Sequence, residues 1–132
     1  MQELSIFTRI INGEIPAHKI YEDDRVIAFL TIQPFSEGHT LVVPKKQIDQ
    51  IWDLETEDFD YLLETTRKIA IHLRKILDSD RIGVVVKGFD VPHAHIHLIP
   101  IPRDKVVNLD PSPEPPIASN EELAKVADRI RM

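Results

Sequence analysis

Three of the six histidines in this chain fall within five residues, at His93, His95 and His97. Side chains of an extended strand point alternately to its two faces, so this spacing predicts that the three imidazoles share one face. The apolar residues between them would point the other way, into a core. Pro92 and Pro100 flank the run, and proline suits the ends of strands better than their middles. A helix would spread the three rings around its circumference and leave no shared site.

The shared face leaves three interpretations of this strand open. It can be a half-buried strand whose polar face merely happens to be histidine, although clustered ionisable groups tend to mark functional sites. It can be a metal site, because neutral imidazole is a common ligand of zinc and other transition metals. It can also be a catalytic site, in which a neutral imidazole attacks phosphorus and forms a covalent phosphoryl- or nucleotidyl-histidine. A fourth histidine, His39, begins another strand-like run at residues 39–44 and would join the cluster if the two strands were neighbours.

Three segments of the sequence together resemble one protein family. The run VPHAHIHLIP (residues 91–100) resembles the signature of the histidine triad (HIT) proteins, in which three histidines alternate with apolar residues. The segments SIFTRIINGEIPAHKIYEDDRVIAFL (residues 5–30) and GHTLVVPKK (residues 38–46) are similar to the N-terminal half of the same family, in the same order. The resemblance covers most of residues 5–100.

This resemblance implies a nucleotidyl hydrolase or transferase that acts on a nucleoside 5′-phosphate derivative, either a phosphoramidate or a dinucleoside polyphosphate. His95 would be the nucleophile on the α-phosphorus, and water would then cleave the nucleotidyl-histidine intermediate. His97 and His39 would donate hydrogen bonds to phosphate oxygens, and His93 would fix the orientation of the cluster. The chemistry requires no metal or other cofactor, although four histidines are compatible with adventitious zinc. Two alternatives of other classes stay open: a nucleotide-binding regulatory module with little turnover, and a histidine metal-binding protein.

The resemblance also implies a pocket for a purine nucleotide. The positions that match the family's pocket, or lie beside it, are Ile6, Phe7, Ile10, Phe29, Thr31, Ile32, Lys87, Asp90 and Val91. The chain departs from the family at Thr31, where an aspartate usually holds the ribose hydroxyls. It departs again at Phe89 and Asp90, where a glutamine and a hydroxyl residue are usual. An ionised Asp90 would repel phosphate, and Lys87 would supply a compensating charge.

Composition limits the partners of the chain. The 132 residues carry a formal net charge of −6, which argues against a nucleic-acid polymer or an anionic membrane as the main partner. A small nucleotide needs only local donors and is compatible with this charge. The absence of cysteine excludes disulfides and thiolate metal ligands. Because the sequence shows neither a signal peptide nor a long apolar run, we expect a cytoplasmic protein.

The hydrophobic pattern predicts an α+β domain with an antiparallel sheet of about five strands, one long helix and one or two short helices. Ser5 would cap a short helix that ends near residue 12, and Thr56 a long helix that ends near residue 77. The expected strands cover residues 19–22, 25–32, 39–44, 81–87 and 91–100. A small open sheet has edges to protect, and the family protects them by joining two subunits into a continuous sheet, so we expect a homodimer.

The C-terminal part of the chain differs in character from the rest. Residues 1–102 are expected to form the HIT domain core, and residues 103–132 a proline-rich extended tail with a short helix. The prolines that exclude a helix or a central strand there are Pro111, Pro113, Pro115 and Pro116. Ser119 and Glu122 form a capping-box pattern, which predicts that the last helix begins after Ser119.

Overall fold

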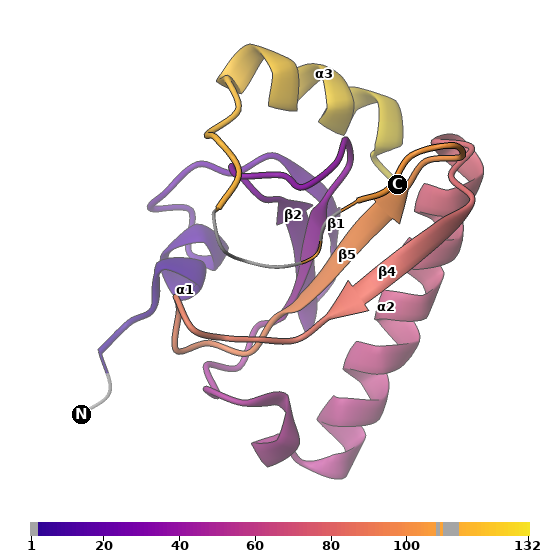
Figure 1. Cartoon of the computed structure of the whole chain (residues 1–132). Coiled ribbons are helices and arrows are strands. Elements are labelled where there is room, and N and C mark those ends of the chain that lie inside the picture. Colours follow the sequence, from indigo (N-terminus) through magenta and orange to yellow (C-terminus); the bar gives the residue numbers. More distant parts are fainter. Residues whose placement is uncertain (1–2, 108, 110–113) are drawn as a thin grey trace.

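The computed structural model describes residues 3–107, 109 and 114–132 (Figure 1). Its helices are α1 (Ile6–Ile11), α2 (Thr56–Ile76) and α3 (Asn120–Ile130), with one short 3-10 helix, η1 (Ile51–Asp53). Its strands are β1 (Lys19–Glu22), β2 (Val26–Leu30), β3 (Thr40–Pro44), β4 (Arg81–Val85) and β5 (Ile96–Ile101). They form an antiparallel five-stranded sheet in the order β1-β2-β3-β5-β4. The predicted α+β class and strand number are confirmed.

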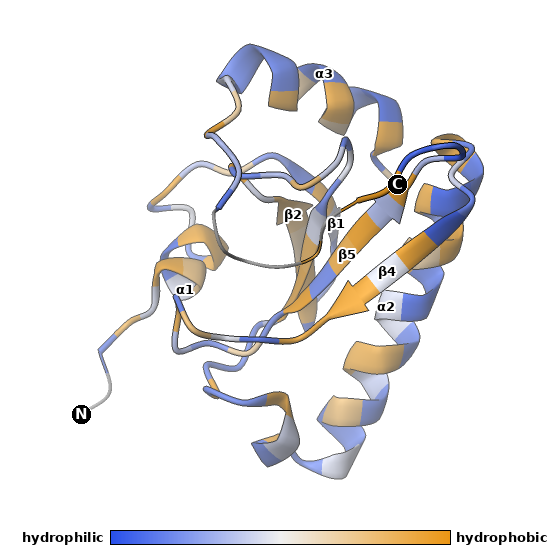
Figure 2. Ribbon diagram, in the orientation of Figure 1, coloured by the Kyte–Doolittle hydropathy of each residue, from blue (hydrophilic) through white to orange (hydrophobic). Residues whose placement is uncertain are grey.

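The sheet lies between two unequal helical layers, with α2 and α3 on one side and α1 on the other (Figure 1). All five residues of β2 are buried, as expected for a strand that is apolar on both faces. Val26, Ala28 and Leu30 pack in the core under α2 and α3. Ile27 and Phe29 pack in a smaller core under α1. The strand alternation therefore separates the two cores, and Figure 2 shows the apolar stripe of α2 turned towards the sheet.

The short first helix begins where the sequence predicts, and the long helix differs in its cap. The Ser5 side chain accepts a hydrogen bond from the Thr8 backbone N–H, so Ser5 is the N-cap of α1. In α2 the N-cap is Glu55, which makes no side-chain capping bond, and Thr56 is already the first helical residue. The prediction that Thr56 caps this helix is wrong. The acidic first turn, with Glu57 and Asp58, favours the start of α2 through the helix dipole instead.

The histidine strand begins later than predicted. β5 starts at Ile96, so only His97 of the three clustered histidines lies in the regular strand. Before it the chain bends at Pro92 and His93, where the His93 N–H donates to the Val91 carbonyl at 2.8 Å. Pro92 has no N–H to offer a strand ladder, which accounts for irregular backbone at this point.

The alternation of faces nevertheless continues through the irregular segment. Ala94, Ile96 and Leu98 are buried in the core under α2. The intervening His97 pairs in register with Leu41, which belongs to the core under α1. The histidine side chains and the apolar side chains are therefore separated as the spacing predicts.

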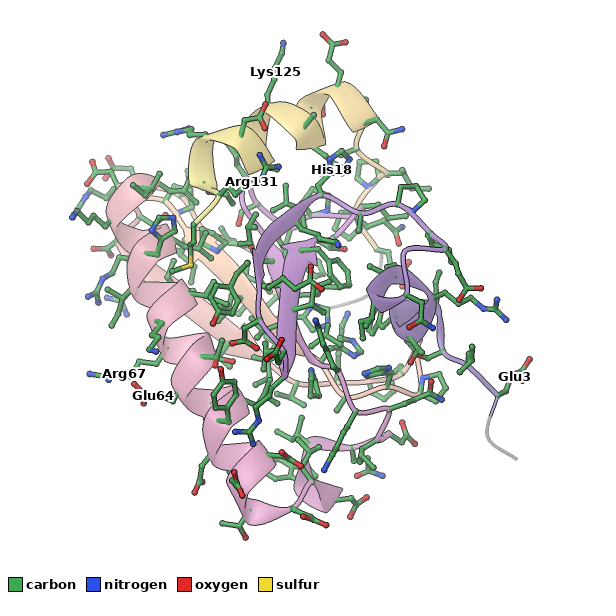
Figure 3. All side chains as sticks on the ribbon, turned by 180° about the vertical axis from the view of Figure 1, so that it is seen from behind. Glu3, His18, Glu64, Arg67, Lys125 and Arg131 are labelled. Atoms are coloured by element: carbon green, nitrogen blue, oxygen red, sulfur yellow. The ribbon has the colours of Figure 1, made fainter. Side chains whose placement is uncertain are left out.

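The C-terminal helix packs on the same domain. Leu123, Ala127 and Ile130 of α3 are buried in the core that α2 and the sheet share. Ser119 caps the helix as predicted, since its hydroxyl accepts from the Glu122 N–H at 3.1 Å. Figure 3 shows His18 close to α3, whereas Lys125 points away from the protein. Of the predicted proline-rich tail, residues 111 and 113 lie outside the described residues.

Two side-chain and backbone contacts fasten the end of α3. The His72 Nε2 lies 2.7 Å from the Ile130 carbonyl, and the Met132 N–H donates to the Ile20 carbonyl of β1 at 2.9 Å. The contact of His72 therefore joins α2 to α3. No helix within the described ranges combines the length and the apolar character that crossing a lipid bilayer demands.

Gly38, next to His39, provides a test of this packing. Its φ is +89°, and a Cβ atom there would lie 2.5 Å from the Leu77 Cδ1 atom. Gly13 has a similar φ of +81° but would meet no atom within 4 Å. Alanine in the left-handed region costs about 1–2 kcal/mol at either position, and Gly38→Ala adds a clash. We expect Gly38→Ala to lower the free energy of unfolding in urea clearly more than Gly13→Ala; equal losses would contradict the packing described here.

Candidate active site

Four histidines gather on the α1 side of the sheet. The ring centroids of His95 and His97 are 5.1 Å apart, and those of His39 and His97 are 5.2 Å apart. All four histidines are buried, and none has more than 8% of its surface exposed; they are His39, His93, His95 and His97. His39 precedes β3, whose antiparallel partner β5 carries His97, so the sheet brings together segments far apart in the sequence.

Hydrogen bonds to backbone carbonyls determine which nitrogen carries the proton in two of these rings. A carbonyl oxygen can only accept, so the 2.7 Å contact between His95 Nδ1 and the His93 carbonyl places a proton on Nδ1. In a neutral ring, His95 Nε2 then has a free lone pair. The His93 proton lies on Nε2, which donates to the Pro44 carbonyl at 2.7 Å. The His93 Nδ1 atom consequently accepts, and the Ser5 hydroxyl lies 2.7 Å from it.

The other two rings form a chain of hydrogen bonds that ends in the site. The Phe35 backbone N–H donates to His39 Nδ1 at 3.1 Å, so the His39 proton lies on Nε2. That atom is 3.0 Å from His97 Nδ1, which must accept and leaves the His97 proton on Nε2. The His97 Nε2 atom is buried and has no hydrogen-bond partner among the residues that the structure describes.

This unpaired donor has a direct chemical meaning. A buried N–H without an acceptor costs about 1–3 kcal/mol, so a site that retains one is suited to a ligand that supplies an oxygen. His95 and His97 therefore present different groups: a nitrogen lone pair on the first ring and an N–H donor on the second. A nucleophile beside a hydrogen-bond donor is the combination that attack on a phosphorus or carbonyl centre requires.

Burial keeps these rings neutral. It lowers the pKa of His97 to about 3, with the adjacent His39 and the Lys87 charge adding to the effect. It lowers the pKa of His39 to about 4, again with a contribution from Lys87. The pKa values of His93 and His95 are also lowered, chiefly by burial, although the carbonyl acceptors of both rings oppose the shift. At neutral pH the four imidazoles are uncharged, and the proton positions assigned above apply.

Three of the expected pocket residues lie together against the histidines. Phe7 and Ile10 of α1 and Phe29 of β2 belong to one buried cluster, and Val91 packs against it. The Phe7 ring meets the Phe29 ring edge-on at 5.5 Å and the His95 ring at 4.9 Å. The structure thus brings Phe7 into contact with the ring that has the free lone pair, and Phe29 packs behind Phe7.

The other expected pocket residues are more exposed. Ile6 and Ile32 are 48% and 54% exposed, and neither belongs to the buried cluster under α1. Thr31 is partly buried, and its hydroxyl accepts from the Gln33 N–H at 3.3 Å. Asp90 is exposed, but its negative charge is close enough to oppose the lowering of the His95 pKa.

Lys87 approaches the histidines through a residue that the sequence analysis missed. Its ammonium lies 5.7 Å from the centre of the Phe35 ring, and this ring stacks on His39 with centroids 5.6 Å apart. Phe35 thus both orients His39 and carries a cation at the rim of the site. No sequence signal marks this role, because Phe35 lies in an irregular loop whose backbone direction no periodicity predicts.

Two cavities adjoin the cluster. One, of about 270 Å³, opens beside His95 between η1 and the segment before the histidines; its lining is Asp49, Gln50, Ile51, Trp52, Val86, Lys87, Gly88, Ala94 and His95. The other, of about 340 Å³, lies between α3 and the loop before β3, and Thr31 and His39 are among its walls. The first cavity therefore has His95 as part of its wall.

The histidines do not form an assembled metal site. Across the described ranges, no group of three or more His, Cys, Asp or Glu side chains is arranged to hold a metal ion. Both ring nitrogens of His93 are engaged by Ser5 and Pro44, and His39 and His97 use one nitrogen each on the other. A metal could bind the free His95 Nε2 lone pair, but ligation by His39 or His93 in addition would break these bonds.

Comparison with known proteins gives the family. The HIT domain family model matches residues 12–106. An uncharacterized HIT-like protein of Methanocaldococcus jannaschii is 41% identical over 102 residues, which are 74% of this chain and 78% of that protein. The crystal structure of a Hit-like protein involved in cell-cycle regulation from Bartonella henselae, with an unknown ligand, superposes with a TM-score of 0.84 at 36% identity. That superposition covers 96% of this chain and 93% of the Bartonella chain.

A further structural neighbour bears on the metal question. A histidine triad family protein from Mycobacterium smegmatis has bound zinc in its crystal structure. The superposition has a TM-score of 0.75 at 27% identity, and it covers 94% of this chain and 93% of the Mycobacterium chain. Zinc therefore binds to at least one protein of this fold, which agrees with the expectation of adventitious zinc but does not make zinc a requirement here.

The family model and the sequence relatives agree with the geometry of the histidine cluster. The match extends over all five strands and includes the four histidines of the site. This chain belongs to the histidine triad (HIT) family, within a superfamily of nucleotide-binding proteins and hydrolases.

Proposed function

We propose that this protein is a nucleotidyl hydrolase or transferase that attacks the α-phosphorus of a nucleoside 5′-phosphate derivative. The observation that carries the proposal is the contrast between His95 Nε2, which has a lone pair, and His97 Nε2, a buried donor without a partner. A phosphate group offers an electrophilic phosphorus for the first atom and an oxygen acceptor for the second. We also propose that the protein forms a homodimer and is located in the cytoplasm.

In the first step, the His95 Nε2 lone pair forms a bond to the α-phosphorus as the bond to the leaving group breaks. The leaving group is an amine from a phosphoramidate, which takes up a proton from solvent as the P–N bond breaks, or the nucleoside phosphate that forms the other part of a dinucleoside polyphosphate. The His97 N–H donates to a non-bridging phosphate oxygen and stabilises the charge that develops there. His39 holds His97 in the tautomer that makes this donation.

In the second step, water cleaves the nucleotidyl-histidine, releases a nucleoside monophosphate and restores His95. While phosphorus is attached, the His95 ring carries a positive charge that its Nδ1–H shares with the His93 carbonyl. This carbonyl therefore stabilises the intermediate as well as the tautomer of the free ring. No step of this scheme uses a metal.

The surroundings of the histidines favour a nucleotide whose base is held by apolar contact. The cluster of Phe7, Ile10 and Phe29 supplies flat and aliphatic surface beside His95, which suits a purine ring. The ribose would be recognised by the neutral Thr31 rather than by a carboxylate. Lys87 supplies positive charge near the phosphate position and offsets the repulsion from Asp90.

We further propose that two copies pair through β4. This strand is one edge of the sheet, and Figure 2 shows that its arrowhead end is hydrophobic. Val84 of β4 is 59% exposed. The opposite edge, β1, already receives the Met132 N–H at Ile20. Among the described strands, β4 pairs with β5 alone. Leu63 and Ile71 of α2 are exposed apolar residues that add to the surface available for pairing.

The nucleophile can be identified by trapping. Wild-type protein incubated with adenosine 5′-phosphoramidate or a dinucleoside polyphosphate, then quenched in alkali, should contain one nucleotide on a base-stable, acid-labile bond. His95→Ala should show no adduct and no turnover, because the ring that attacks is gone. His18→Ala, which removes a histidine that lies outside the cluster, should retain both. The measurement is intact-protein mass spectrometry.

Three results of this experiment would contradict the proposal. An adduct on His95→Ala would exclude this ring as the nucleophile. Tight nucleotide binding without turnover of either substrate would favour a regulatory module. Activity lost with a chelator and restored by zinc would favour the metal interpretation.

The pH dependence of turnover should reflect the buried state of the nucleophile. The neutral form of His95 is the active one, and burial lowers its pKa below the usual value of about 6.5. As pH falls, the rate should therefore hold through pH 6.5 and decline only below it. Initial rates of phosphoramidate hydrolysis between pH 4.5 and 8 measure this limb; a midpoint at or above 6.5 would contradict a buried neutral nucleophile.

Pairing through β4 can be tested by molar mass. Wild-type protein should elute as a dimer in size-exclusion chromatography with light scattering, and Val84→Glu should shift it towards the monomer by placing charge at the paired edge. Ile117→Glu changes an exposed apolar residue in the segment before α3 and should leave the dimer intact. A monomeric wild type at tens of micromolar, or equal effects of both substitutions, would exclude this interface.

A further inference from the structure

We propose that Ser5 is a positioning residue for the nucleophile, acting through a hydrogen-bonded group that we call the α1-cap network: Ser5, Thr8, Gln47 and His93. The inference builds on the proposed function, since it assigns His95 as the group that is positioned. It concerns a residue whose sequence signal indicates only a helix cap, and the contacts of Ser5 extend well beyond that role.

The α1-cap network joins three separate segments of the chain. The Ser5 hydroxyl lies 2.7 Å from His93 Nδ1 and accepts the Thr8 N–H at 3.0 Å. The Gln47 Oε1 atom accepts from the Ser5 N–H at 2.8 Å and from the Thr8 hydroxyl at 2.6 Å. Ser5 is 6% exposed, so these bonds form away from bulk water, where their geometry is most restrictive.

The direction of each bond follows from its partners. His93 Nε2 must carry a proton because it faces the Pro44 carbonyl, so Nδ1 can only accept in the neutral ring. The Thr8 hydroxyl lies 3.3 Å from His93 Nδ1 but donates its proton to Gln47 Oε1 at 2.6 Å. The Ser5 hydroxyl therefore donates its single proton to His93 Nδ1 at 2.7 Å rather than to the Thr8 hydroxyl oxygen at 3.2 Å. Ser5 and Pro44 hold the two ring nitrogens of His93 from opposite sides and leave the ring one tautomer and one orientation.

His93 transmits this restraint to the nucleophile through its own backbone. The carbonyl of His93 accepts the His95 Nδ1–H at 2.7 Å, and that bond keeps the lone pair on His95 Nε2. The bend at residues 92–93 lies outside the strand ladder, and the Ala94 N–H, in the same peptide plane as the His93 carbonyl, donates to the Ile48 carbonyl at 2.6 Å. The anchored His93 ring adds a second, side-chain restraint on the direction of this carbonyl. Ser5 thus acts on His95 at a distance of two hydrogen bonds.

The same serine begins the helix that forms the apolar pocket. Ser5 is the N-cap of α1, and two residues later Phe7 meets the edge of the His95 ring at 4.9 Å. One hydroxyl therefore ties the pocket helix and the catalytic segment to a common point. A shift of α1 on ligand binding would therefore move His93. If the bond from Ser5 to His93 were lost, the Ser5 hydroxyl would keep only its capping bond to the Thr8 N–H.

The chain offers a matched control for the capping role. Ser119 is the N-cap of α3 and accepts the Glu122 N–H at 3.1 Å, as Ser5 accepts the Thr8 N–H. It is exposed, and α3 packs on the face of the sheet opposite to α1. Glycine is tolerated at an N-cap far better than alanine. The test therefore compares Ser5→Gly with Ser119→Gly, and with Ser5→Thr, which retains a hydroxyl.

Two measurements apply to each variant. The first is kcat and KM for adenosine 5′-phosphoramidate, where Ser5→Gly should lower kcat at least roughly tenfold with a much smaller change in KM, because misplacement of a reacting group acts on the chemical step. The second is the 15N NMR spectrum of the imidazoles without substrate. It should show His93 as a single Nε2–H tautomer in the wild type. In Ser5→Gly it should show a mixture, because a ring that Ser5 no longer holds can turn away from the Pro44 carbonyl that fixes its tautomer.

Ser119→Gly should match the wild type in both measurements, and Ser5→Thr should restore kcat and the single tautomer. Unchanged kcat and tautomers in Ser5→Gly, or an equal loss in Ser119→Gly, would overturn the proposal. If no substrate is turned over, the proposed function fails, and the NMR comparison still decides the positioning role. Should Ser5→Gly not fold, a wild-type His93 with its proton on Nδ1 would exclude the role, and the Nε2–H tautomer retained in Ser5→Thr would support it.

Discussion

The bond from the His95 Nδ1–H to the His93 carbonyl is the interaction on which the chemistry of this site depends. An imidazole has two nitrogens, and only the one without a proton can attack. A carbonyl acceptor removes that choice permanently, because it cannot donate in return. The backbone around residue 93 must therefore be held firmly. The irregular bend before β5, which at first resembles a defect in a strand, is what turns this carbonyl towards the ring two residues later.

The sheet fixes the position and the tautomer of the hydrogen-bond donor, His97. Antiparallel pairing of β3 with β5 places His39 and His97 side by side, and a backbone N–H from the preceding loop fixes the first ring. The Phe35 N–H then determines which nitrogen of His39 carries the proton, and His39 in turn determines it for His97. In both cases a backbone group, the His93 carbonyl or the Phe35 N–H, determines where the ring proton lies. The protonation pattern is therefore a property of the fold rather than of the side chains alone.

The sequence predicts the parts of this structure that follow a period. Alternation predicts the two cores of β2 and the separation of His97 from Ile96 and Leu98, and capping residues predict the starts of α1 and α3. It does not predict where β5 begins, because strand boundaries depend on which backbone groups find partners across the sheet. It also cannot reveal that Ser5 bonds to a ring 88 residues away, since only the assembled fold brings them together.

The remaining question is why a stable domain retains an unpaired N–H at its centre. The His97 donor meets no acceptor among the described residues, and burial lowers the pKa of its ring to about 3, so the ring is uncharged at neutral pH. The cost of about 1–3 kcal/mol is small beside the apolar contacts of two cores, which lets the fold carry it. A phosphate oxygen would remove that cost on binding. Under the proposed function, the cost of this donor in the free protein and its affinity for a phosphate oxygen have one source.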